Sequence, residues 1–113
     1  MSETAKAGRL AERATAEALE MFGFRVLEMN RRAGHLELDI VAEREGKTVA
    51  VEVRSRAEGA PVDAASSVTQ AKKRRVEKAA RAIAHGGDVS ILYAFVSLKG
   101  GAVSALEIID ESF

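Results

Sequence analysis

Apolar and polar residues alternate along two segments in the first half of the chain. Residues 36–42 (LELDIVA) and residues 49–54 (VAVEVR) both carry an apolar side chain at every second position. Because successive side chains of a strand point to opposite faces, each segment predicts a strand with one apolar and one polar face. The apolar faces are expected to carry Leu36, Leu38 and Ile40 on the first strand and Val49, Val51 and Val53 on the second.

A short charged segment joins the two strands and contains the glycine that a tight hairpin turn favours. A turn centred on Glu45-Gly46 pairs residues whose numbers sum to 91, which puts Asp39 opposite Glu52 and Glu37 opposite Arg54. Directly opposed side chains on one face are about 4.5–5.5 Å apart at Cβ. The alternation and the turn therefore predict one patch that holds three carboxylates and a guanidinium.

Facing carboxylates repel each other, so folding alone gives no reason for this patch. A hard divalent cation such as Mg²⁺ or Mn²⁺ would offset the repulsion, because it takes carboxylate, carbonyl and water oxygens as ligands. Such an ion polarises a phosphoryl oxygen and generates hydroxide near neutral pH. The alternative is a solvated hairpin face on which a Glu37–Arg54 ion pair offsets the charge. A register change of one residue would separate the patch unless a bulge restored it.

The rest of the pattern predicts two helices and three further strands around this hairpin. Residues 57–66 include the only proline and are typical of a mobile loop beside the patch. Ser66 or Ser67 is expected to cap the second helix, which stops at Gly86-Gly87. The inward stripe of the first helix is expected at Leu10, Ala14, Ala18 and Met21 or Phe22. The elements are a helix over 4–21, strands over 24–30, 36–42 and 49–54, a helix ending at 85, and strands over 90–98 and 102–109. This order predicts an α+β fold, three-layer α/β/α-like, with helices packed on a mixed sheet.

Length and composition suit one compact domain over residues 1–113, because 47% of the residues are hydrophobic and can form a core. The chain has no cysteine, which excludes a disulfide framework and a thiolate zinc site. No basic-then-apolar leader opens the sequence, and the longest apolar run, residues 91–96, is too short to cross a bilayer. A cytoplasmic protein without a membrane partner is therefore expected.

Basic residues gather on the second predicted helix although the whole chain is neutral, with 17 basic and 17 acidic residues. A local basic surface can contact phosphates even when the net charge of the protein is zero. The cluster therefore favours a nucleic-acid backbone as its partner. The alternative is an ordinary solvated helix face. The cluster consists of Lys72, Lys73, Arg74, Arg75, Lys78 and Arg81, with Arg54 and Arg56 upstream.

Two further charged residues lie on predicted helix lines that lead toward the acidic patch. Lys72 continues the apolar stripe of the second helix backward by helical steps, and Glu12 shares a line with Ala16 and Leu19. A lysine whose stem only covers apolar surface is the alternative for Lys72. A solvated first turn is the alternative for Glu12. The stripe on the second helix is Val68, Val76, Ala79, Ala80 and Ile83.

Several segments together resemble a known family. Asp39, followed on the next strand by Glu52-Val53-Arg54, is similar to the D…(D/E)xK signature of restriction-endonuclease-like nucleases, with arginine in the usual lysine position. The order and spacing of the other segments resemble the small bacterial YraN-like family, which is related to Holliday-junction resolvases. These segments are Ala11-Glu12, residues 23–32, 37–42 and 51–56, Ser67-Val68 and residues 72–75. The family usually has glycine where this chain has Ala11 and Leu36.

The resemblance implies a restriction-endonuclease-like mixed β-sheet flanked by helices and a site that uses Mg²⁺ or Mn²⁺. Asp39, Glu52 and the Val53 carbonyl are the implied metal ligands, with Glu37 and Glu12 as outer candidates. Arg54 and Lys72 join Asp39 and Glu52 as the implied catalytic residues. Because a guanidinium stays charged, Arg54 can stabilise a phosphate but cannot act as a general base. The implied nucleic-acid contacts are Arg54, Arg56, Lys73, Arg74 and Lys78.

Three classes of function follow from these observations. The first is a metal-dependent endonuclease acting on DNA, with branched DNA suggested by the resemblance to resolvases. The second is a nucleic-acid-binding or assembly protein that retains the nuclease fold without turnover. The third is a protein-interaction domain that uses its sheet edges. The sequence leaves a homodimer open.

Overall fold

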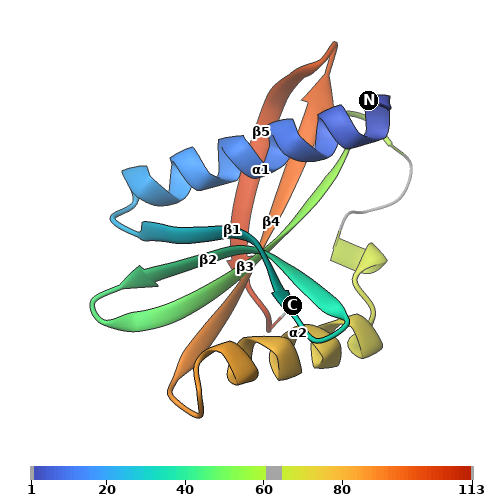
Figure 1. Cartoon of the computed structure of the whole chain (residues 1–113). Helices are drawn as coiled ribbons and strands as arrows, with labels where there is room; N and C mark the ends of the chain where they lie inside the picture. The colour runs from blue at the N-terminus through green and yellow to red at the C-terminus, as the bar shows by residue number, and fades with distance from the viewer. Residues whose placement is uncertain (1, 61–64, 113) are drawn as a thin grey trace.

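The computed structural model describes residues 2–60 and 65–112, which form a five-stranded sheet with a helix on each face (Figure 1). The α-β-β-β-α-β-β order expected from the pattern is confirmed. The elements are α1 (Glu3–Met21), β1 (Arg25–Ala33), β2 (Leu36–Arg44), β3 (Lys47–Ala57), the 3₁₀ turn η1 (Ala65–Ser67), α2 (Gln70–Ile83), β4 (Val89–Lys99) and β5 (Ala102–Asp110). Of the expected loop over 57–66, residues 61–64 lie outside the described part of the chain.

The sheet is mixed, as predicted. Its strands lie in the order β1-β2-β3-β4-β5, and all neighbours are antiparallel except β3 and β4, which are parallel and joined through α2. One core lies between the sheet and α2 around Val76 and Tyr93, and the other lies between the sheet and α1 around Leu19 and Val51. The α+β fold with helices on both sides of the sheet is therefore confirmed. No helix among the described residues is long and apolar enough to cross a membrane.

The β2–β3 hairpin has the predicted turn and register. Glu45 and Gly46 have φ values of 52° and 79°, and a two-residue turn with two positive φ values matches the right-handed twist of the strands. The paired residues sum to 91 from Arg44–Lys47 to Ile40–Val51, where the β2–β3 ladder ends. Beyond this point β2 pairs only with β1, and β3 pairs only with β4. The end of the ladder places Asp39 and Glu52 at an opening between two strands.

The predicted common face of Leu36, Leu38 and Ile40 is wrong. Leu38 packs in the core under α2 together with the partly buried Leu36, whereas Ile40 packs in the core under α1. The strand changes face at Asp39, and the β1 residue opposite it, Asn30, has a left-handed φ of 55°. A left-handed residue within a strand turns the backbone locally, as in β-bulges. Strict alternation therefore fails at the position that carries the acidic patch.

The inward stripe of α1 also differs from the prediction. Ala11, Thr15 and Leu19 are fully buried, whereas Met21 and Phe22 are 86% and 64% exposed. The buried line is displaced by one residue from Leu10, Ala14 and Ala18, which are only partly buried. Thr15 looks polar in the sequence, but its hydroxyl donates to the Ala11 carbonyl at 2.8 Å and is thereby satisfied inside the core.

The second helix begins later than expected, and its buried stripe is confirmed. Thr69 is its N-cap, because its hydroxyl accepts a hydrogen bond from the Lys72 N–H at 3.1 Å. Ser66 and Ser67, the predicted caps, belong to η1 instead. The residues that face the sheet are Val68, Val76, Ala79 and Ala80, with Ile83 packed at the edge of the same core.

Candidate active site

Asp39 and Glu52 hold each other's backbone at the open end of the β2–β3 ladder. The Asp39 N–H donates to Glu52 Oε1 at 3.0 Å, and the Val53 N–H donates to Asp39 Oδ2 at 2.8 Å. Two side chains thus replace the backbone hydrogen bonds that the next ladder pair would have made. This reciprocal arrangement fixes both carboxylates with backbone contacts on rigid strands and leaves Asp39 Oδ1 and Glu52 Oε2 outside these two bonds.

The backbone of Val53 faces the same opening. In an extended strand the N–H and C=O of one residue point to the same side, as the paired bonds of an antiparallel ladder show. Because the Val53 N–H reaches Asp39, its carbonyl also faces the Asp39 side and not β4. The strand geometry therefore puts the Val53 carbonyl on the side of β3 that faces Asp39.

The electrostatics of the pair oppose ionisation. Burial, followed by the repulsion of Asp39, raises the pKa of Glu52 to about 7. Burial also raises the pKa of Asp39, although the Val53 N–H and the charge of Lys72 act in the opposite direction. Glu52 is only 4% exposed. Carboxylates desolvated in this way gain when a cation joins them.

Lys72 and Arg54 bring positive charge to the site from α2 and β3. Lys72 Nζ lies 3.7 Å from Glu52 Oε2, so the predicted reach of Lys72 from the first turn of α2 is confirmed. Arg54 does not form the expected pair with Glu37, because the ladder ends before these residues. Its Nη2 donates instead to Ser67 Oγ of η1 at 3.2 Å, a partner that the sequence did not indicate.

Glu12 and Glu37 lie around Asp39 from α1 and β2. The pKa of Glu12 is raised by burial and then by Asp39, and it is lowered by a hydrogen bond with the Asn30 side chain. Glu37 is close enough to raise the pKa of both Glu12 and Asp39. The predicted inward direction of Glu12 is thus confirmed. Asn30 was missed by sequence reasoning, since nothing in the strand pattern marks it apart from the tolerance of asparagine for positive φ.

The full set of predicted metal ligands does not come together. Among the described residues, no group of three or more Asp, Glu, His or Cys side chains is placed so that it could hold a metal ion. Within the described part of the chain, the carboxylates that the reciprocal hydrogen bonds bring together are Asp39 and Glu52. An ion at this position would use these two side chains, the Val53 carbonyl and water, while Glu12 and Glu37 would act through that water. Mg²⁺ usually keeps several water ligands in protein sites, because it loses its hydration reluctantly.

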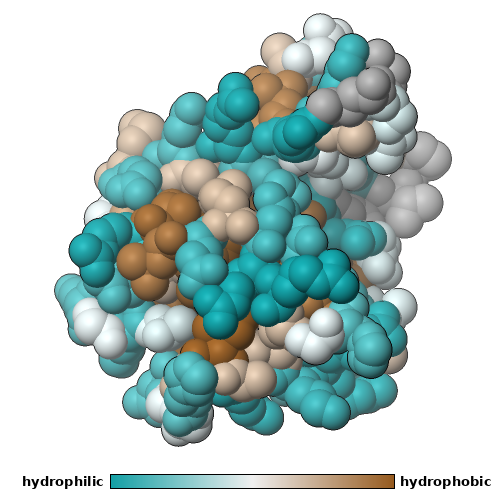
Figure 2. Space-filling model, viewed as in Figure 1, coloured by the Kyte–Doolittle hydropathy of each residue, from teal (hydrophilic) through white to brown (hydrophobic). Residues whose placement is uncertain are grey.

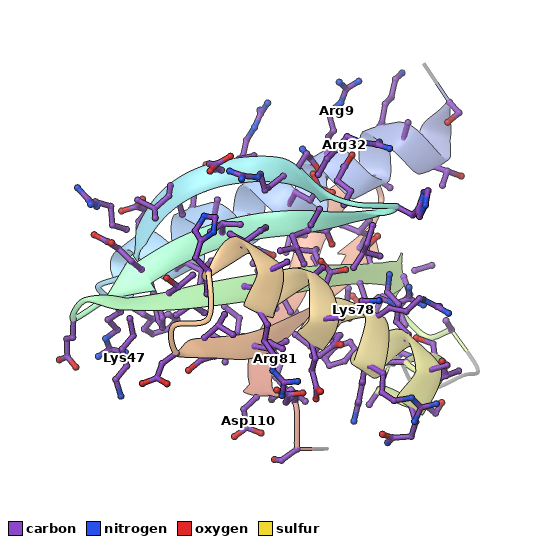
Figure 3. The ribbon with its side chains drawn as sticks, turned by 60° about the horizontal axis from the view of Figure 1, so that its bottom comes forward. Arg9, Arg32, Lys47, Lys78, Arg81 and Asp110 are labelled. Atoms are coloured by element: carbon purple, nitrogen blue, oxygen red, sulfur yellow. The ribbon has the colours of Figure 1, made fainter. Side chains whose placement is uncertain are left out.

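The basic residues of α2 divide between the surface and the core. Arg74 and Lys78 are exposed, and Figure 3 shows Lys78 on this helix. Lys73, predicted as a nucleic-acid contact, is instead 6% exposed, and its Nζ donates to the Glu111 carbonyl at 3.2 Å. This prediction is wrong because Lys73 lies one position from Lys72 on the buried side of the helix. Arg56 is half-buried and lines a cavity beside the site.

The visible face of the molecule in Figure 2 is mainly hydrophilic, with separate apolar spots. The large apolar side chains most exposed among the described residues are Met21, Phe22, Leu27 and Met29. They belong to the end of α1, the turn after it and the edge strand β1. None of them belongs to β3 or α2, the elements that carry Glu52, Arg54 and Lys72.

The mixed sheet with a helix on each face defines an α+β domain, and the carboxylate pair lies at the open end of its β2–β3 ladder. The chain belongs to the uncharacterised protein family UPF0102, whose model matches residues 11–98. The family membership expected from the sequence is therefore confirmed.

Relatives of this family match the chain over different shares of their length. A UPF0102 protein of Oleidesulfovibrio alaskensis is 45% identical over 74 residues, which are 66% of this chain and 37% of that protein. One from Myxococcus xanthus is 42% identical over 79 residues, which are 70% of this chain and 63% of that protein. One from Nitrosomonas europaea is 31% identical over 115 residues, across 100% of this chain and 98% of its own. The chain thus spans less than two thirds of the first two relatives.

Solved structures are similar to the chain at low sequence identity. An XisH family protein from Nostoc punctiforme has a TM-score of 0.52 at 16% identity, over 86% of this chain and 98% of its own. A repair endonuclease from Pyrococcus abyssi has a TM-score of 0.49 at 17% identity, over 89% of this chain and 41% of its own. At 16% identity, the likeness to the XisH family protein concerns the fold alone.

Proposed function

We propose that this protein is a metal-dependent, endonuclease-like protein that cleaves phosphodiester bonds in DNA. The observation that carries the proposal is the reciprocal pair of Asp39 and Glu52 at the open end of the β2–β3 ladder. The fold places the buried carboxylate of Glu52 beside the half-buried carboxylate of Asp39 although burial raises the pKa of both and the charge of Asp39 raises that of Glu52 further. A site that is electrostatically unfavourable by itself is typical of a functional site.

The donor set suits a hard divalent cation, Mg²⁺ or Mn²⁺. Asp39, Glu52 and the Val53 carbonyl would hold the ion, and Glu37 and Glu12 would orient its water ligands. When bound, such an ion polarises a phosphoryl oxygen and supplies hydroxide near neutral pH. The reciprocal hydrogen bonds keep both carboxylates in place before any ion arrives, so little reorganisation is needed on binding.

Lys72 and Arg54 would act on the scissile phosphate. Both cations lie beside the carboxylate pair, and Lys72 is already 3.7 Å from Glu52. Charge that develops on phosphate oxygens during cleavage is stabilised by such fixed cations. Arg54 stays protonated and cannot take a proton from water. Activation of water would therefore be left to the chemistry that a bound ion supplies, and we expect cleavage to be slow or restricted to particular DNA structures, with branched DNA as the first candidate.

The exposed basic residues of α2 would bind the DNA backbone next to this site. Arg74 and Lys78 lie on the same helix as Lys72, and we expect a strand that reaches the carboxylates to pass along α2. Such contacts position the nucleic acid without reading its sequence. Arg54 and Arg56 extend the positive charge along β3.

The test is a cleavage assay on duplex, single-stranded and four-way-junction DNA with Mg²⁺, Mn²⁺ or a chelator. Wild type is compared with Asp39→Asn and Glu52→Gln, which keep an oxygen acceptor for the backbone N–H groups. Glu17→Gln, an exposed carboxylate on α1, serves as the matched control. We expect metal-dependent cleavage in wild type and in the control and its loss in both site variants.

Two outcomes would contradict the proposal in different ways. Cleavage that persists in Asp39→Asn or Glu52→Gln would come from a contaminant or another site. Absence of cleavage on every DNA would favour the second candidate function, a nucleic-acid-binding or assembly protein that retains the nuclease fold. The observation that favours this alternative is Arg54, which replaces a lysine and bonds Ser67.

A further inference from the structure

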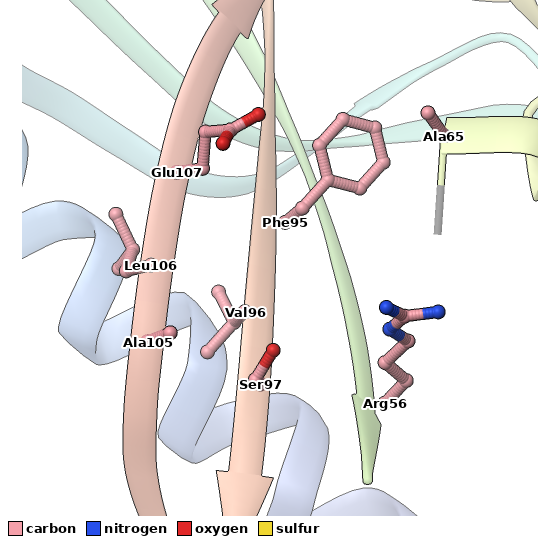
Figure 4. A pocket seen from close by; sticks show the side chains of 8 residues that line it. All are labelled: Arg56, Ala65, Phe95, Val96, Ser97, Ala105, Leu106 and Glu107. Carbon is pink, nitrogen blue, oxygen red and sulfur yellow. The ribbon is translucent and has the colours of Figure 1, made fainter. Parts of the chain in front are cut away.

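A cavity of about 290 Å³ lies on the α2 side of the sheet, over β3, β4 and β5 and next to η1 (Figure 4). From its lining we infer that it binds one unpaired nucleobase of a DNA strand whose backbone lies at Asp39 and Glu52. The inference rests on the proposed function for the position of the strand, and it assigns the substrate class: DNA with unpaired nucleotides beside the cut. The polar and aromatic residues of the lining are Arg56, Phe95, Ser97 and Glu107.

The Arg56 guanidinium supplies a hydrogen-bond donor that the described residues do not satisfy. Its Nη1 is buried and has no hydrogen-bond partner among them. A buried donor without a partner is unfavourable, and a guanidinium can only donate. A carbonyl or ring-nitrogen acceptor on a bound base would satisfy this nitrogen. Arg56 Nη1 is thus a donor in the cavity wall that an acceptor on a ligand would satisfy.

Phe95 and Glu107 supply the other two contacts that a base needs. The Phe95 ring borders the cavity, and it is kept in orientation by stacking on Tyr93, with ring centroids 6.5 Å apart and planes inclined by 15°. Base stacking on such a ring is tolerant of sequence. The Glu107 carboxylate only accepts hydrogen bonds, whereas Arg56 only donates. A nucleobase carries donors and acceptors on one flat edge and an aromatic face, which matches this lining.

The cavity is aligned with the carboxylate site along β3. Arg54 pairs with Phe95 across the β3–β4 ladder, and Arg56 pairs with Ser97. These two positions follow Glu52 by two and four residues, which is about 7 and 13 Å along a strand. Stacked nucleotides of one DNA strand advance by about 3.4 Å each. A strand bound at Glu52 therefore reaches the cavity within about two to four stacked nucleotides.

A base in an intact duplex cannot use this cavity. Its faces are stacked on neighbouring base pairs and its hydrogen-bonding edge is paired, so entry requires unstacking and unpairing. Bases in single-stranded segments, flaps and junction arms avoid this requirement. The cavity accordingly favours DNA with unpaired nucleotides near the scissile bond and disfavours uninterrupted duplex.

The test measures binding in EDTA, where no metal-dependent cleavage occurs. Fluorescence anisotropy compares three probes: a mixed-sequence single-stranded 12-mer, an abasic 12-mer with the same backbone, and a blunt duplex. The variants are Phe95→Leu, which removes the ring but keeps apolar volume, and Arg56→Gln. Arg81→Gln, at the far end of α2 from Lys72, removes one exposed arginine as the control. Circular dichroism and thermal melts establish that each variant folds.

We expect Phe95→Leu to weaken binding of the single-stranded 12-mer about fivefold to a hundredfold, the range for loss of one base–aromatic stack. The same variant should bind the abasic 12-mer and the blunt duplex within about twofold of wild type. Arg56→Gln should weaken single-strand binding at least about threefold more than Arg81→Gln, because it removes the donor of a specific hydrogen bond.

Equal effects of Phe95→Leu on the normal and abasic 12-mers would overturn the inference, as would unchanged affinity in both cavity variants. The result is separable from the proposed function. Base-dependent binding without cleavage would support base binding in the cavity and contradict the proposed nuclease activity. If Phe95→Leu and Arg56→Gln cleave a flapped duplex as well as wild type does, the result would support the nuclease activity and contradict base binding in the cavity.

Discussion

The carboxylate of Glu52 accepts a hydrogen bond from the backbone N–H of Asp39, with 3.0 Å between N and Oε1. Asp39 in turn accepts from Val53, the residue after Glu52. Each carboxylate therefore stabilises the strand that carries the other while the two charges repel. The hydrogen bonds stabilise the folded state, whereas the repulsion between the two charges destabilises it. Substitutions that keep the acceptor and remove the charge separate these two contributions.

Glu52→Gln should stabilise the protein at neutral and alkaline pH in the absence of metal. The pKa of Glu52 is about 7 in the folded protein against an ordinary 4.5, so the folded state binds its proton more tightly than the unfolded state does. The stability of wild type therefore falls as pH rises from 4.5 to 7, by roughly 3 kcal/mol in full. Glutamine does not titrate and still accepts from Asp39. Urea unfolding in EDTA between pH 4 and 8.5 measures the difference.

The gain should vanish near pH 4, where Glu52 is protonated in both states. Glu17→Gln, which removes one exposed carboxylate on α1, is the matched control for the loss of a charge. A Glu52→Gln protein that is less stable than wild type at pH 8 would mean that the ionised carboxylate contributes to folding, through Lys72 for example.

Mn²⁺ should bind wild type with about one ion per chain and bind Asp39→Asn at least about tenfold more weakly, because a carboxamide offers no negative charge to a hard cation. Wild-type affinity should rise between pH 5.5 and 8 as the raised pKa of Glu52 is passed and both ligands become ionised. Isothermal titration calorimetry in a non-chelating buffer measures both effects. If wild type gives no heat of binding, or if Asp39→Asn gives the same heat as wild type, Asp39 and Glu52 do not form a metal site.

The hairpin could be predicted from the sequence because its determinants are local. Glu45-Gly46 fixes the turn, the turn fixes the register, and the register brings Asp39 to Glu52. The reach of Lys72 was predictable for a similar reason, since helical periodicity alone places it beside the buried stripe. Period and turn chemistry need no knowledge of the rest of the fold.

The end of the β2–β3 ladder could not be predicted in this way. It depends on the path of β1, in which Asn30 adopts a left-handed backbone opposite Asp39, and on two side chains that take over backbone hydrogen bonds. The pairing of Arg54 with Ser67 likewise depends on where η1 packs. These features arise from contacts between distant segments, which neither alternation nor composition records.

Asn30→Ala should destabilise the protein by about 1 kcal/mol relative to Asn30→Gly. Asn30 has φ of 55°, a region that costs an alanine roughly 1–2 kcal/mol and a glycine very little. Both variants lose the side-chain hydrogen bond to Glu12, so their difference isolates the backbone contribution. Urea unfolding at one pH measures it. Equal stability of the two variants would mean that β1 relaxes away from the left-handed conformation.

Reversing charge at Arg74 and Lys78 together should weaken DNA binding across sequences. Both side chains are exposed on α2, and phosphate contacts release counterions, so the slope of log affinity against log salt should shrink by up to about 2 units. Anisotropy titrations over a range of salt concentrations measure the slope. The control is Lys47→Glu with Lys99→Glu, an equal charge change in two hairpins. A control that loses as much affinity would show that only net charge matters.

Lys73→Ala and Arg74→Ala, at adjacent positions of α2, should have opposite phenotypes. Lys73 is 6% exposed and donates to the Glu111 carbonyl, so its truncation removes packing and a hydrogen bond and should lower the free energy of unfolding by about 1–3 kcal/mol. Its effect on DNA affinity should stay within about twofold. Arg74 is exposed, so Arg74→Ala should weaken DNA binding with little change in stability. Urea unfolding and anisotropy on the same preparations measure both quantities. If Lys73→Ala folds and loses more DNA affinity than Arg74→Ala does, Lys73 contacts DNA after all. The DNA backbone would then lie on another side of α2.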